Sequence, residues 1–410
     1  MTRPPDLTTR PDASRAALTR RQALGGAAAA AGAAAPLLHA GPAAARSRHR
    51  ARSPRGGAAG TDIIYIGAWL TPEVYAARFD SETAELTAMG PAAAVNSSWA
   101  VRHPRLPVLY VASGIGDGVA YSFAIDERTG ALTQTSAIST GGTGTQGIIS
   151  FISVDQASQT LLVANFASGM VLSLPIGEDG TLSTPVSSVQ DVGSGPTARQ
   201  DGPHPHCVVT DPTGRFVLVA DFGADRVFVY PFDRRTRTIS TAGAPAPYAT
   251  PPGSGPRRLV WHPDGRTLYL MTELTATIST LEWDPRTGLL TQRQTQAADP
   301  PDFTGTRSAA ELALSRDARF LYMSNRGENA LQVYAVDPVT AIPALVQRTP
   351  CGGSVPWSFS IDPTGRWMFV ANYASDQVNV FSIDRRTGLL DEHPASTTVP
   401  APDGVVASCW

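Results

Sequence analysis

Side chains that could take part in a reaction occupy two kinds of position in this chain: directly after a strand-like run, or at the start of one. Glu273, Arg326 and Tyr373 each directly follow a short strand-like run, while His206 and Arg257 open another such run. A carboxylate or an imidazole can transfer protons to a bound molecule, and guanidinium groups hold carboxylates or developing oxyanions. We therefore expect proton-transfer chemistry on an anionic or hydroxylated small molecule.

These residues belong to a segment that repeats along the chain beyond residue 61. Each clear copy reads as a strand, a tight turn of the Asp/His-Pro-x-Gly kind, a second strand, a polar turn and a third strand. The clear copies begin at His206, Leu259, Leu312 and Phe359, and weaker ones begin at Val101 and Ser153. The residues that end the second strand of each copy are Ser113, Asn165, Asp221, Thr272, Asn325 and Asn372.

The spacing of the copies predicts the fold. Successive second strands end 47 to 56 residues apart, and a period of about 50 residues with four strands per unit is typical of a β-propeller. Residues 63–68 form one more second strand without a first strand ahead of it, and residues 404–409 can supply that strand. We predict an all-β fold, a seven-bladed β-propeller over residues 61–410 with four-stranded antiparallel blades, closed by pairing of the N- and C-terminal strands. An open stack of separate sandwiches is the alternative, and the complementary chain ends argue against it.

This architecture predicts where the chemical groups meet. In a propeller blade the first strand lines the central channel and the second runs antiparallel beside it. The start of each first strand and the end of each second strand therefore lie on one rim. The candidate catalytic residues on that rim are His206, Glu273, Arg257 and Arg326. The candidate substrate-binding residues there are His204, Glu311, Phe222, Tyr373 and Trp357.

Each of these residues also has a structural interpretation. Glu273 and Arg326 could form an ion pair between blades, Arg257 could donate to backbone carbonyls in a turn, and His206 could be a satisfied structural histidine. His204 and His206 could ligate a metal, but no matching third ligand is evident, so we expect neither a metal nor a cofactor. The acids of the Asp-Pro turns, Asp211 and Asp362, are expected to form those turns.

Composition excludes several classes of function. The chain has 410 residues and a formal net charge of −2, but residues 1–60 hold ten Arg and two acids. From residue 61 onward there are 23 basic and 33 acidic residues, a net charge of −10, which disfavours nucleic-acid binding. Every basic residue is Arg, so lysine Schiff-base chemistry is excluded. The three cysteines, Cys207, Cys351 and Cys409, are too few for a disulfide framework and fit no zinc pattern.

The N-terminal region has the features of an export signal. Arg20 and Arg21 form a twin-arginine pair, followed by a weakly hydrophobic Ala/Gly run and by cleavage candidates ending at Ala40 or Ala45. We expect residues 1–45 to be a signal for the twin-arginine (Tat) export machinery and residues 46–60 to be a flexible leader. The alternative, an Ala-rich transmembrane helix, is weaker because Pro36 interrupts the run. The mature protein is thus expected outside the cytoplasm, without a stable membrane anchor, as a monomer.

Several ordered motifs resemble one family. They are the Gly-Pro-His-Pro-His of residues 202–206, the Gly-Ser-Gly-Pro-Arg of 253–257, the Thr-Glu-Leu of 272–274, the Ala-Ala-Glu of 309–311 and the Ser-Asn-Arg-Gly of 324–327. Over residues 61–410 the chain resembles the seven-bladed lactonases, which include propeller-type 6-phosphogluconolactonases and carboxy-cis,cis-muconate lactonizing enzymes. The resemblance implies an active site at His206, Glu273, Arg257 and Arg326. The chain departs from the family pattern at Cys207, Arg258 and Trp357, which predicts an altered substrate.

Residues and resemblance together give a functional hypothesis. We expect an exported lactonase-like enzyme that hydrolyses, or forms, the lactone ring of a sugar lactone or related hydroxy acid at the channel mouth. Arg257 and Arg326 would hold a carboxylate or polarise the carbonyl, and Glu273 or His206 would activate water. Export argues against a phosphorylated substrate made inside the cell. The alternative is a non-catalytic propeller that binds a small molecule or a protein through the same rim.

Overall fold

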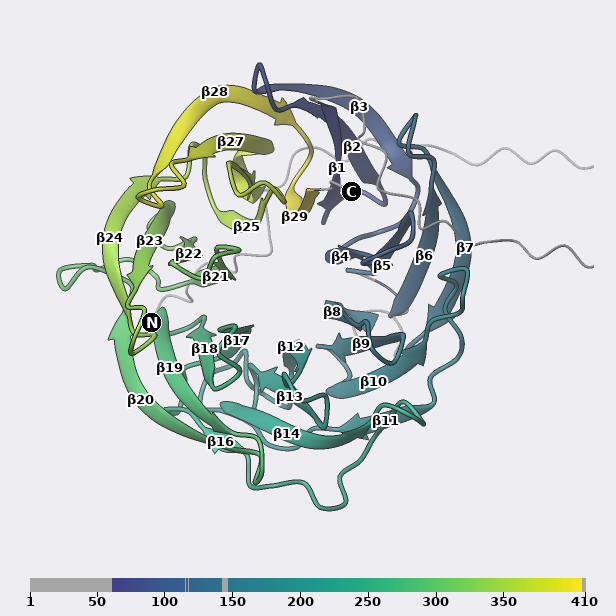
Figure 1. The fold of residues 1–410 in the computed structure, drawn as a ribbon, viewed down its shortest axis with the longest axis vertical. Coiled ribbons are helices and arrows are strands. Elements are labelled where there is room, and N and C mark those ends of the chain that lie inside the picture. Colours follow the sequence, from purple (N-terminus) through teal and green to yellow (C-terminus); the bar gives the residue numbers. More distant parts are fainter. Residues whose placement is uncertain (1–60, 115, 117, 142–146, 408–410) are drawn as a thin grey trace, which may run out of the picture. The chain divides into compact units, whose positions relative to one another are not determined.

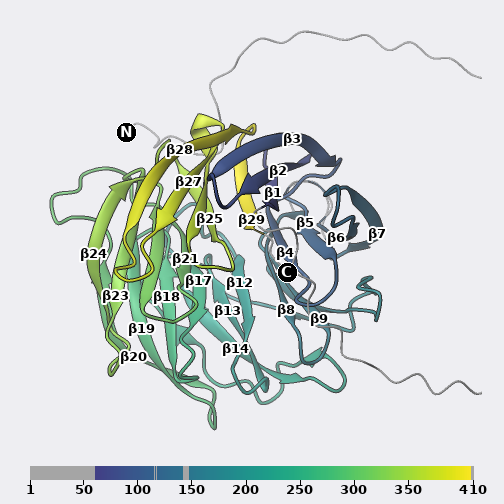
Figure 2. The ribbon, with the colours of Figure 1, turned by 45° about the horizontal axis from the view of Figure 1, so that its top comes forward.

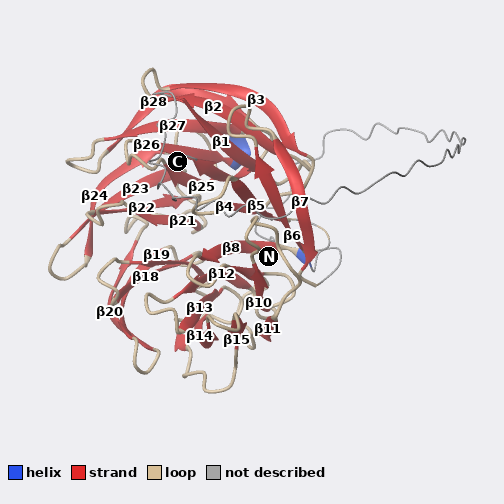
Figure 3. Ribbon diagram, turned by 45° about the vertical axis from the view of Figure 1, so that its right-hand side comes forward, coloured by secondary structure: helices blue, strands red, loops and turns tan. Residues whose placement is uncertain are grey.

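The described residues form a ring of seven antiparallel sheets. The computed structural model describes residues 61–114, 116, 118–141 and 147–407. In Figure 1 the first strands of the sheets surround the centre, and the fourth strands lie at the periphery. Colouring by secondary structure shows strands almost throughout (Figure 3). The predicted seven-bladed all-β propeller is confirmed, whereas the predicted signal (1–45) and leader (46–60) lie outside the described residues. None of the described helices is long and apolar enough to cross a membrane.

The blades are numbered in chain order, and their strands are given from the centre outward. Blade 1 consists of β29 (Pro402–Ala407), β1 (Thr61–Ala68), β2 (Val74–Asp80) and β3 (Glu85–Ala93). Blade 2 consists of β4 (Trp99–Arg102), β5 (Val108–Ala112), β6 (Val119–Ile125) and β7 (Leu132–Ser139). Blade 3 consists of β8 (Ile149–Asp155), β9 (Thr160–Asn165), β10 (Met170–Pro175) and β11 (Ser187–Gln190).

The remaining four blades follow the same plan. Blade 4 consists of β12 (Pro205–Thr210), β13 (Phe216–Asp221), β14 (Arg226–Asp233) and β15 (Thr238–Ile239), with β16 (Tyr248–Ala249) also paired to β14. Blade 5 consists of β17 (Pro256–Trp261), β18 (Thr267–Thr272), β19 (Thr277–Asp284) and β20 (Leu289–Ala297). Blade 6 consists of β21 (Ala309–Leu314), β22 (Phe320–Asn325), β23 (Ala330–Val336) and β24 (Pro343–Pro350). Blade 7 consists of β25 (Pro356–Ile361), β26 (Trp367–Asn372), β27 (Gln377–Ile383) and β28 (Leu390–Thr398), and a 3-10 turn, η2 (Tyr373–Ser375), follows β26.

The two ends of the chain close the ring within blade 1. Strand β29 pairs antiparallel with β1, with Val405 opposite Ile66. Figure 2 shows β28 and β29 beside the strands of blade 1. The apolar faces of blades 7 and 1 also pack together, since the ring of Phe79 lies 4.8 Å from that of Phe369. The closing strand begins at Pro402, two residues earlier than predicted, and residues 408–410 lie outside the described part.

Six of the seven inner strands carry a β-bulge near their start. In β12, Pro205 pairs with Asp221 and Cys207 with Ala220, so His206 is the extra residue. In β17 the extra residue is likewise Arg257. The other bulged residues are Ser150, Ala310, Trp357 and Asp403. A bulge re-aims the side chains around it, so the start of each inner strand presents its residues differently from a regular strand.

Neighbouring blades are also joined by a recurring buried hydrogen bond. A tyrosine in the second strand of one blade donates its hydroxyl hydrogen to a turn carbonyl of the next blade. The pairs are Tyr65 with Gly130 (2.9 Å), Tyr110 with Gly180 (3.0 Å), Tyr269 with Ala341 (2.6 Å) and Tyr322 with Gly388 (3.0 Å). Burial raises the pKa of Tyr65 to about 12, so this hydroxyl keeps its proton. These bonds tie blades 1, 2, 5 and 6 each to the blade that follows.

We predict that Tyr269→Phe lowers the free energy of unfolding by about 1–3 kcal/mol, because it leaves a buried carbonyl without its donor. Chemical denaturation would measure the change. Tyr248→Phe is the matched control, since the Tyr248 hydroxyl donates to the exposed Gln292 and its loss should cost less than about 0.5 kcal/mol. Equal stability of the two variants would contradict this role for the inter-blade bond.

Candidate active site

The register of the inner strands brings the predicted site positions to one rim. Pro256, which starts β17, pairs with Thr272, which ends β18, and Ala309 pairs with Asn325 in the same way in blade 6. Residues that follow the second strands therefore lie beside residues that start the first strands. The side chains of Glu273 and Arg326 thus meet those of the bulged inner-strand residues.

Glu273 is the centre of this cluster. Its side chain is 1% exposed, and its Oε2 accepts a hydrogen bond from Arg257 Nη1 at 2.6 Å. Its Oε1 lies 2.8 Å from Arg326 Nη2 and 2.8 Å from Arg199 Nη1. Burial alone would raise the pKa of Glu273, but the charges of the three arginines outweigh it and hold that pKa well below its usual value. Glu273 is therefore a carboxylate at neutral pH.

Arg257 and Arg326 are held rigidly around this carboxylate. Arg257 donates from Nε to the carbonyl of Ala310 (2.6 Å), and burial lowers its pKa to about 9, so it is still protonated at neutral pH. Arg326 donates to the carbonyl of Ala309 (3.4 Å) and lies over the ring of Trp357, 4.6 Å from the centroid. Among the described residues, the buried Nε of Arg326 has no hydrogen-bond partner. It is a buried donor whose hydrogen-bonding capacity is unused.

His206 lies in the same cluster as a neutral imidazole. Its side chain is buried, and burial together with the charges of Arg257 and Arg258 holds its pKa well below the usual value. Its Nε2 faces Arg257 Nη1 at hydrogen-bond distance. A guanidinium faces each ring nitrogen and can only donate, but a neutral imidazole has one acceptor; the shorter contact assigns the lone pair to Nε2 and the ring proton to Nδ1. His206 therefore presents a lone pair, which in this arrangement is bonded to Arg257.

Arg258 joins the cluster because of the bulge at Arg257. Consecutive residues of a regular strand point to opposite faces, yet Arg258 Nη1 lies 3.4 Å from His206 Nδ1. Arg258 also donates from Nε to Glu311 at 3.0 Å. Its guanidinium lies over the rings of Trp99 and Phe151. The sequence singled out this arginine only as a departure from the family pattern.

Four of the five predicted substrate-binding residues lie at the cluster, in three groups. The carboxylate of Glu311 is paired with Arg258, and burial raises the pKa of Glu311 despite that positive charge. The rings of Trp357 and Tyr373 pack against each other beside Arg326, with centroids 4.9 Å apart and planes tilted by 36°. Phe222 is fully buried and contacts the ring of His206 at 6.5 Å.

His204 lies apart from the arginine cluster. Its ring stacks on Phe166 with centroids 4.5 Å apart, and Nδ1 lies 2.8 Å from the Phe166 carbonyl. Its Nε2 lies 3.0 Å from Asp201. Both ring nitrogens are thus engaged, and His204 supports the wall of the site through Phe166, which also contacts His206.

Arg199 is the member of the cluster that sequence reasoning missed. It lies in the connection between β11 and β12, outside every strand of the repeat, so strand alignment could not place it. Its side chain is 55% exposed, and it reaches Glu273 while its guanidinium lies 4.8 Å from the centroid of the Phe222 ring. The only sequence signal was a basic residue just before the Gly-Pro-His-Pro-His motif.

A metal site and a cysteine nucleophile are two other kinds of chemistry to consider at this rim. Among the described residues, no group of three or more His, Cys, Asp or Glu side chains could hold a metal ion. Burial raises the pKa of Cys207 to about 11, so its thiol is not a nucleophile at neutral pH.

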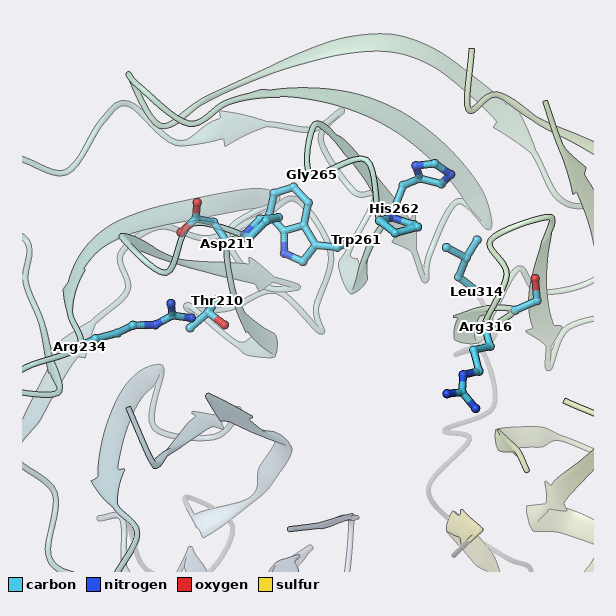
Figure 4. A pocket seen from close by; sticks show the side chains of 11 residues that line it. Thr210, Asp211, Arg234, Trp261, His262, Gly265, Leu314 and Arg316 are labelled. Carbon is cyan, nitrogen blue, oxygen red and sulfur yellow. The ribbon is translucent and has the colours of Figure 1, made fainter. Parts of the chain in front are cut away.

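Two hollows are lined by residues of the inner strands, and one of them reaches the Glu273 cluster at Arg258. One, of about 680 Å³, is lined by inner strands and includes Arg258 and Glu311 in its wall. The second, of about 510 Å³, lies where the inner strands end (Figure 4) and is lined by residues such as Trp261 and Arg316. Asp211, at its edge, accepts hydrogen bonds from the backbone of its own turn. It forms the turn, as its place before Pro212 predicted.

Comparisons with known proteins agree with this fold. A family model described as "Lactonase, 7-bladed beta-propeller" matches residues 63–407. The 6-phosphogluconolactonase of Bacillus subtilis (strain 168) is 30% identical over 345 residues, 83% of this chain and 96% of that protein. The solved structure of the periplasmic gluconolactonase of Pseudomonas aeruginosa is 31% identical, with a TM-score of 0.77, covering 85% of this chain and 99% of that one. A protein from Lactobacillus plantarum is 30% identical, with a TM-score of 0.78 and coverage of 85% and 99%.

We predict that Glu273→Gln destabilises the protein by about 3–5 kcal/mol, because it leaves buried guanidinium charges without their counter-ion. Chemical denaturation at neutral pH would measure this. Arg286→Gln, which removes an exposed ion pair with Asp284, is the control and should cost less than about 1 kcal/mol. A Glu273→Gln protein as stable as the control would show that the carboxylate does not hold the cluster together.

Proposed function

Since the chain belongs to the seven-bladed β-propeller lactonase family and its relatives support a lactone hydrolase, we propose that it is an exported enzyme for unphosphorylated sugar lactones. The reaction would take place at the Glu273 cluster. The observation that carries this proposal is the charge of the cluster. Four arginines (Arg199, Arg257, Arg258 and Arg326) face two carboxylates (Glu273 and Glu311) and a neutral His206, so positive charge is in excess by two.

Excess positive charge matches the course of lactone hydrolysis. The substrate ring is an ester, and attack by water places negative charge on its carbonyl oxygen before a carboxylate is released. Fixed donors at the developing oxyanion stabilise the transition state more than the ground state. The unpartnered Nε of Arg326 is the donor that we assign to the carbonyl oxygen.

We assign proton transfer to His206. When the substrate oxygen takes the hydrogen bond of Arg257, Nε2 of His206 is released and accepts a proton from water. The resulting hydroxide forms a bond to the carbonyl carbon, and the tetrahedral intermediate then breaks the ring C–O bond. The imidazolium returns the proton to the leaving alkoxide, which gives a hydroxy acid. Glu273 stays ionised and orients the arginines, because both of its oxygens lie against guanidinium groups.

Export and the absence of a phosphate on the substrate are inferred from the twin-arginine pair. Arg20 and Arg21 precede the Ala/Gly run that is expected to direct the folded chain outward. One structural relative is described as a periplasmic gluconolactonase. A sugar lactone outside the cytoplasm fits both observations.

We predict that the purified protein opens sugar lactones and that His206→Gln lowers kcat by about 10²–10⁴-fold, the usual contribution of a general base. Titration at constant pH, corrected for spontaneous hydrolysis, would measure turnover of gluconolactone and 6-phosphogluconolactone. His262→Gln, far from the cluster at the other end of β17, is the control. Unchanged turnover in His206→Gln would remove His206 from the mechanism. A clear preference for the phosphate ester would refute the substrate assignment. No turnover of any lactone would favour the alternative, a non-catalytic propeller that binds a small molecule or a protein.

The pKa of His206 also predicts how kcat/KM depends on pH. A base must be unprotonated, and the folded-state pKa of His206 lies well below its usual 6.5. The kcat/KM should therefore be constant from about pH 6.5 to 8 and should fall only at a lower pH, once His206 takes up a proton. Initial rates over pH 4 to 8 would test this, and a fall centred at or above pH 6.5 would contradict it.

A further inference from the structure

We propose that Trp69 and Trp357 determine the specificity of this site by packing against the closed ring of an uncharged sugar lactone. This inference rests on the proposed function and extends it, because Arg326 is assigned to the carbonyl oxygen of the same molecule. The two indoles bind the face of the ring from which C–H bonds project. They favour the ring over the open-chain acid, which has no such face.

A row of three aromatic rings lies beside Arg326. The guanidinium of Arg326 lies 4.6 Å from the centroid of the Trp357 ring. The Trp357 ring packs in turn against Tyr373, at 4.9 Å, and against Trp69, at 6.0 Å with the planes tilted by 35°. Tyr373 is buried, whereas both indoles are partly exposed. The row therefore presents apolar surface next to the guanidinium that carries the unused Nε donor.

The rim leaves room for Trp69 because the neighbouring blade has a glycine there. Trp69 directly follows β1, and Gly114 holds the equivalent place in blade 2. A Cβ at Gly114 would lie 3.2 Å from Cε3 of Trp69 and 2.7 Å from the carbonyl oxygen of Ser97. The backbone N–H of Trp69 donates to the carbonyl of Ala401 at 3.0 Å, just before the closing strand. Closure of the ring and the missing Cβ together fix this indole at the rim.

The backbone that presents Trp357 is held in an unfavourable conformation. Val355, two residues earlier, has a φ of 58°, in the left-handed region that β-branched residues rarely adopt. Its N–H donates to Oδ1 of Asn329 (2.7 Å), and its carbonyl accepts from the N–H of Tyr373 (3.0 Å). Strain of this kind persists where the surrounding structure enforces it, and it is concentrated at functional sites. This turn fixes the bulge at Trp357 and, with it, the direction of the indole.

The same turn carries a residue of the Glu273 cluster in blade 5. Gly255 has a φ of 63° and donates its N–H to Oδ1 of Asp225 (2.9 Å), and Arg257 follows two residues later. In both blades a proline separates the left-handed residue from the bulged one. The turn in blade 5 delivers the side chain that pairs with Glu273, so we assign a site role to the side chain delivered in blade 7. An uncharged indole there offers contact area rather than charge.

A sugar lactone matches this combination of groups. Its carbonyl and hydroxyl oxygens lie around the edge of the ring and accept hydrogen bonds, while the C–H bonds make the faces of the ring apolar. Tryptophan buries such a surface over a large area with little loss of side-chain freedom. With the carbonyl oxygen on Nε of Arg326, one face of the ring lies against the indoles. Hydrolysis opens the ring and removes that face, so the product acid loses this contact.

The test compares a closed ring with an open chain by calorimetry on the full-length protein. Gluconolactam keeps the ring but has an amide in place of the ester, and gluconate is the open-chain acid. We expect Trp69→Leu and Trp357→Leu each to weaken gluconolactam binding by about five- to tenfold, the loss of one aromatic contact. Gluconate binding should change by less than about twofold, because the open chain has no ring face. Replacement of either residue by Phe should restore most of the affinity.

Steady-state kinetics with gluconolactone give a second readout. Among the described residues no arginine lies over the ring of Trp69, which packs against Trp357. Trp69→Leu should therefore raise KM by a similar factor with kcat nearly unchanged. Trp261→Leu is the matched control, since Trp261 is a partly exposed indole at the other end of an inner strand and packs against Trp283 at 5.7 Å. It should leave KM and the affinity for both ligands unaffected.

Three results would overturn the proposal. Equal losses for both ligands in Trp357→Leu, with Trp69→Leu unchanged, would show that Trp357 only holds Arg326 in place. Unchanged affinity in both variants would show that the indoles do not contact the ligand, and a wild-type protein that does not bind gluconolactam would show that no ring site exists. If Trp357→Leu does not fold, Trp69→Leu decides the question.

Calorimetry also separates this proposal from the proposed function, because it needs no turnover. A wild-type protein that opens no lactone but binds gluconolactam through the two indoles would refute the proposed function and support the ring site. Turnover of gluconolactone that both Leu variants retain with an unchanged KM would support the proposed function and overturn the ring site.

Discussion

A single buried carboxylate determines how this rim is built. Glu273 lies against three guanidinium groups that come from different parts of the chain: Arg257 from its own blade, Arg326 from the next blade and Arg199 from the connection before blade 4. Without that negative charge the three cations would repel each other in a poorly solvated place. Because the carboxylate touches each of them, one residue fixes both the contact between blades 5 and 6 and the direction of their donors.

The arrangement of this cluster also requires the bulges of the inner strands. A regular strand would place Arg257 and Arg258 on opposite faces, and only one of them could reach His206. The extra residue in β17 lets both contact it. The same irregularity at Trp357 places an aromatic ring over Arg326. A feature repeated in six blades thus brings His206, Arg257 and Trp357 to the cluster in the blades where these are the bulged residues.

The sequence was sufficient for the architecture but not for these details. Strand periodicity, turn residues and the complementary ends predicted seven blades, and strand direction alone placed Glu273 and Arg326 on one rim. The bulges could not be predicted, because they depend on the partner strand. The extra residue Asp403, for example, shifts the closing strand so that it begins at Pro402. Arg199 could not be placed either, because a connection without strand pattern takes its position from buried contacts such as those of Gln200.

The neutrality of His206 follows from the same electrostatics that make the site attract anions. Burial and two adjacent arginines disfavour the imidazolium, so the cluster keeps its excess of positive charge at neutral pH and still contains one proton acceptor. If His206 were protonated at rest, the cluster would gain a charge but lose that acceptor. A simple ion pair of one arginine and one glutamate would supply neither the excess positive charge nor the proton acceptor. For the proposed reaction, the crowding of arginines around one carboxylate therefore supplies both an excess of positive charge and an unprotonated imidazole beside it.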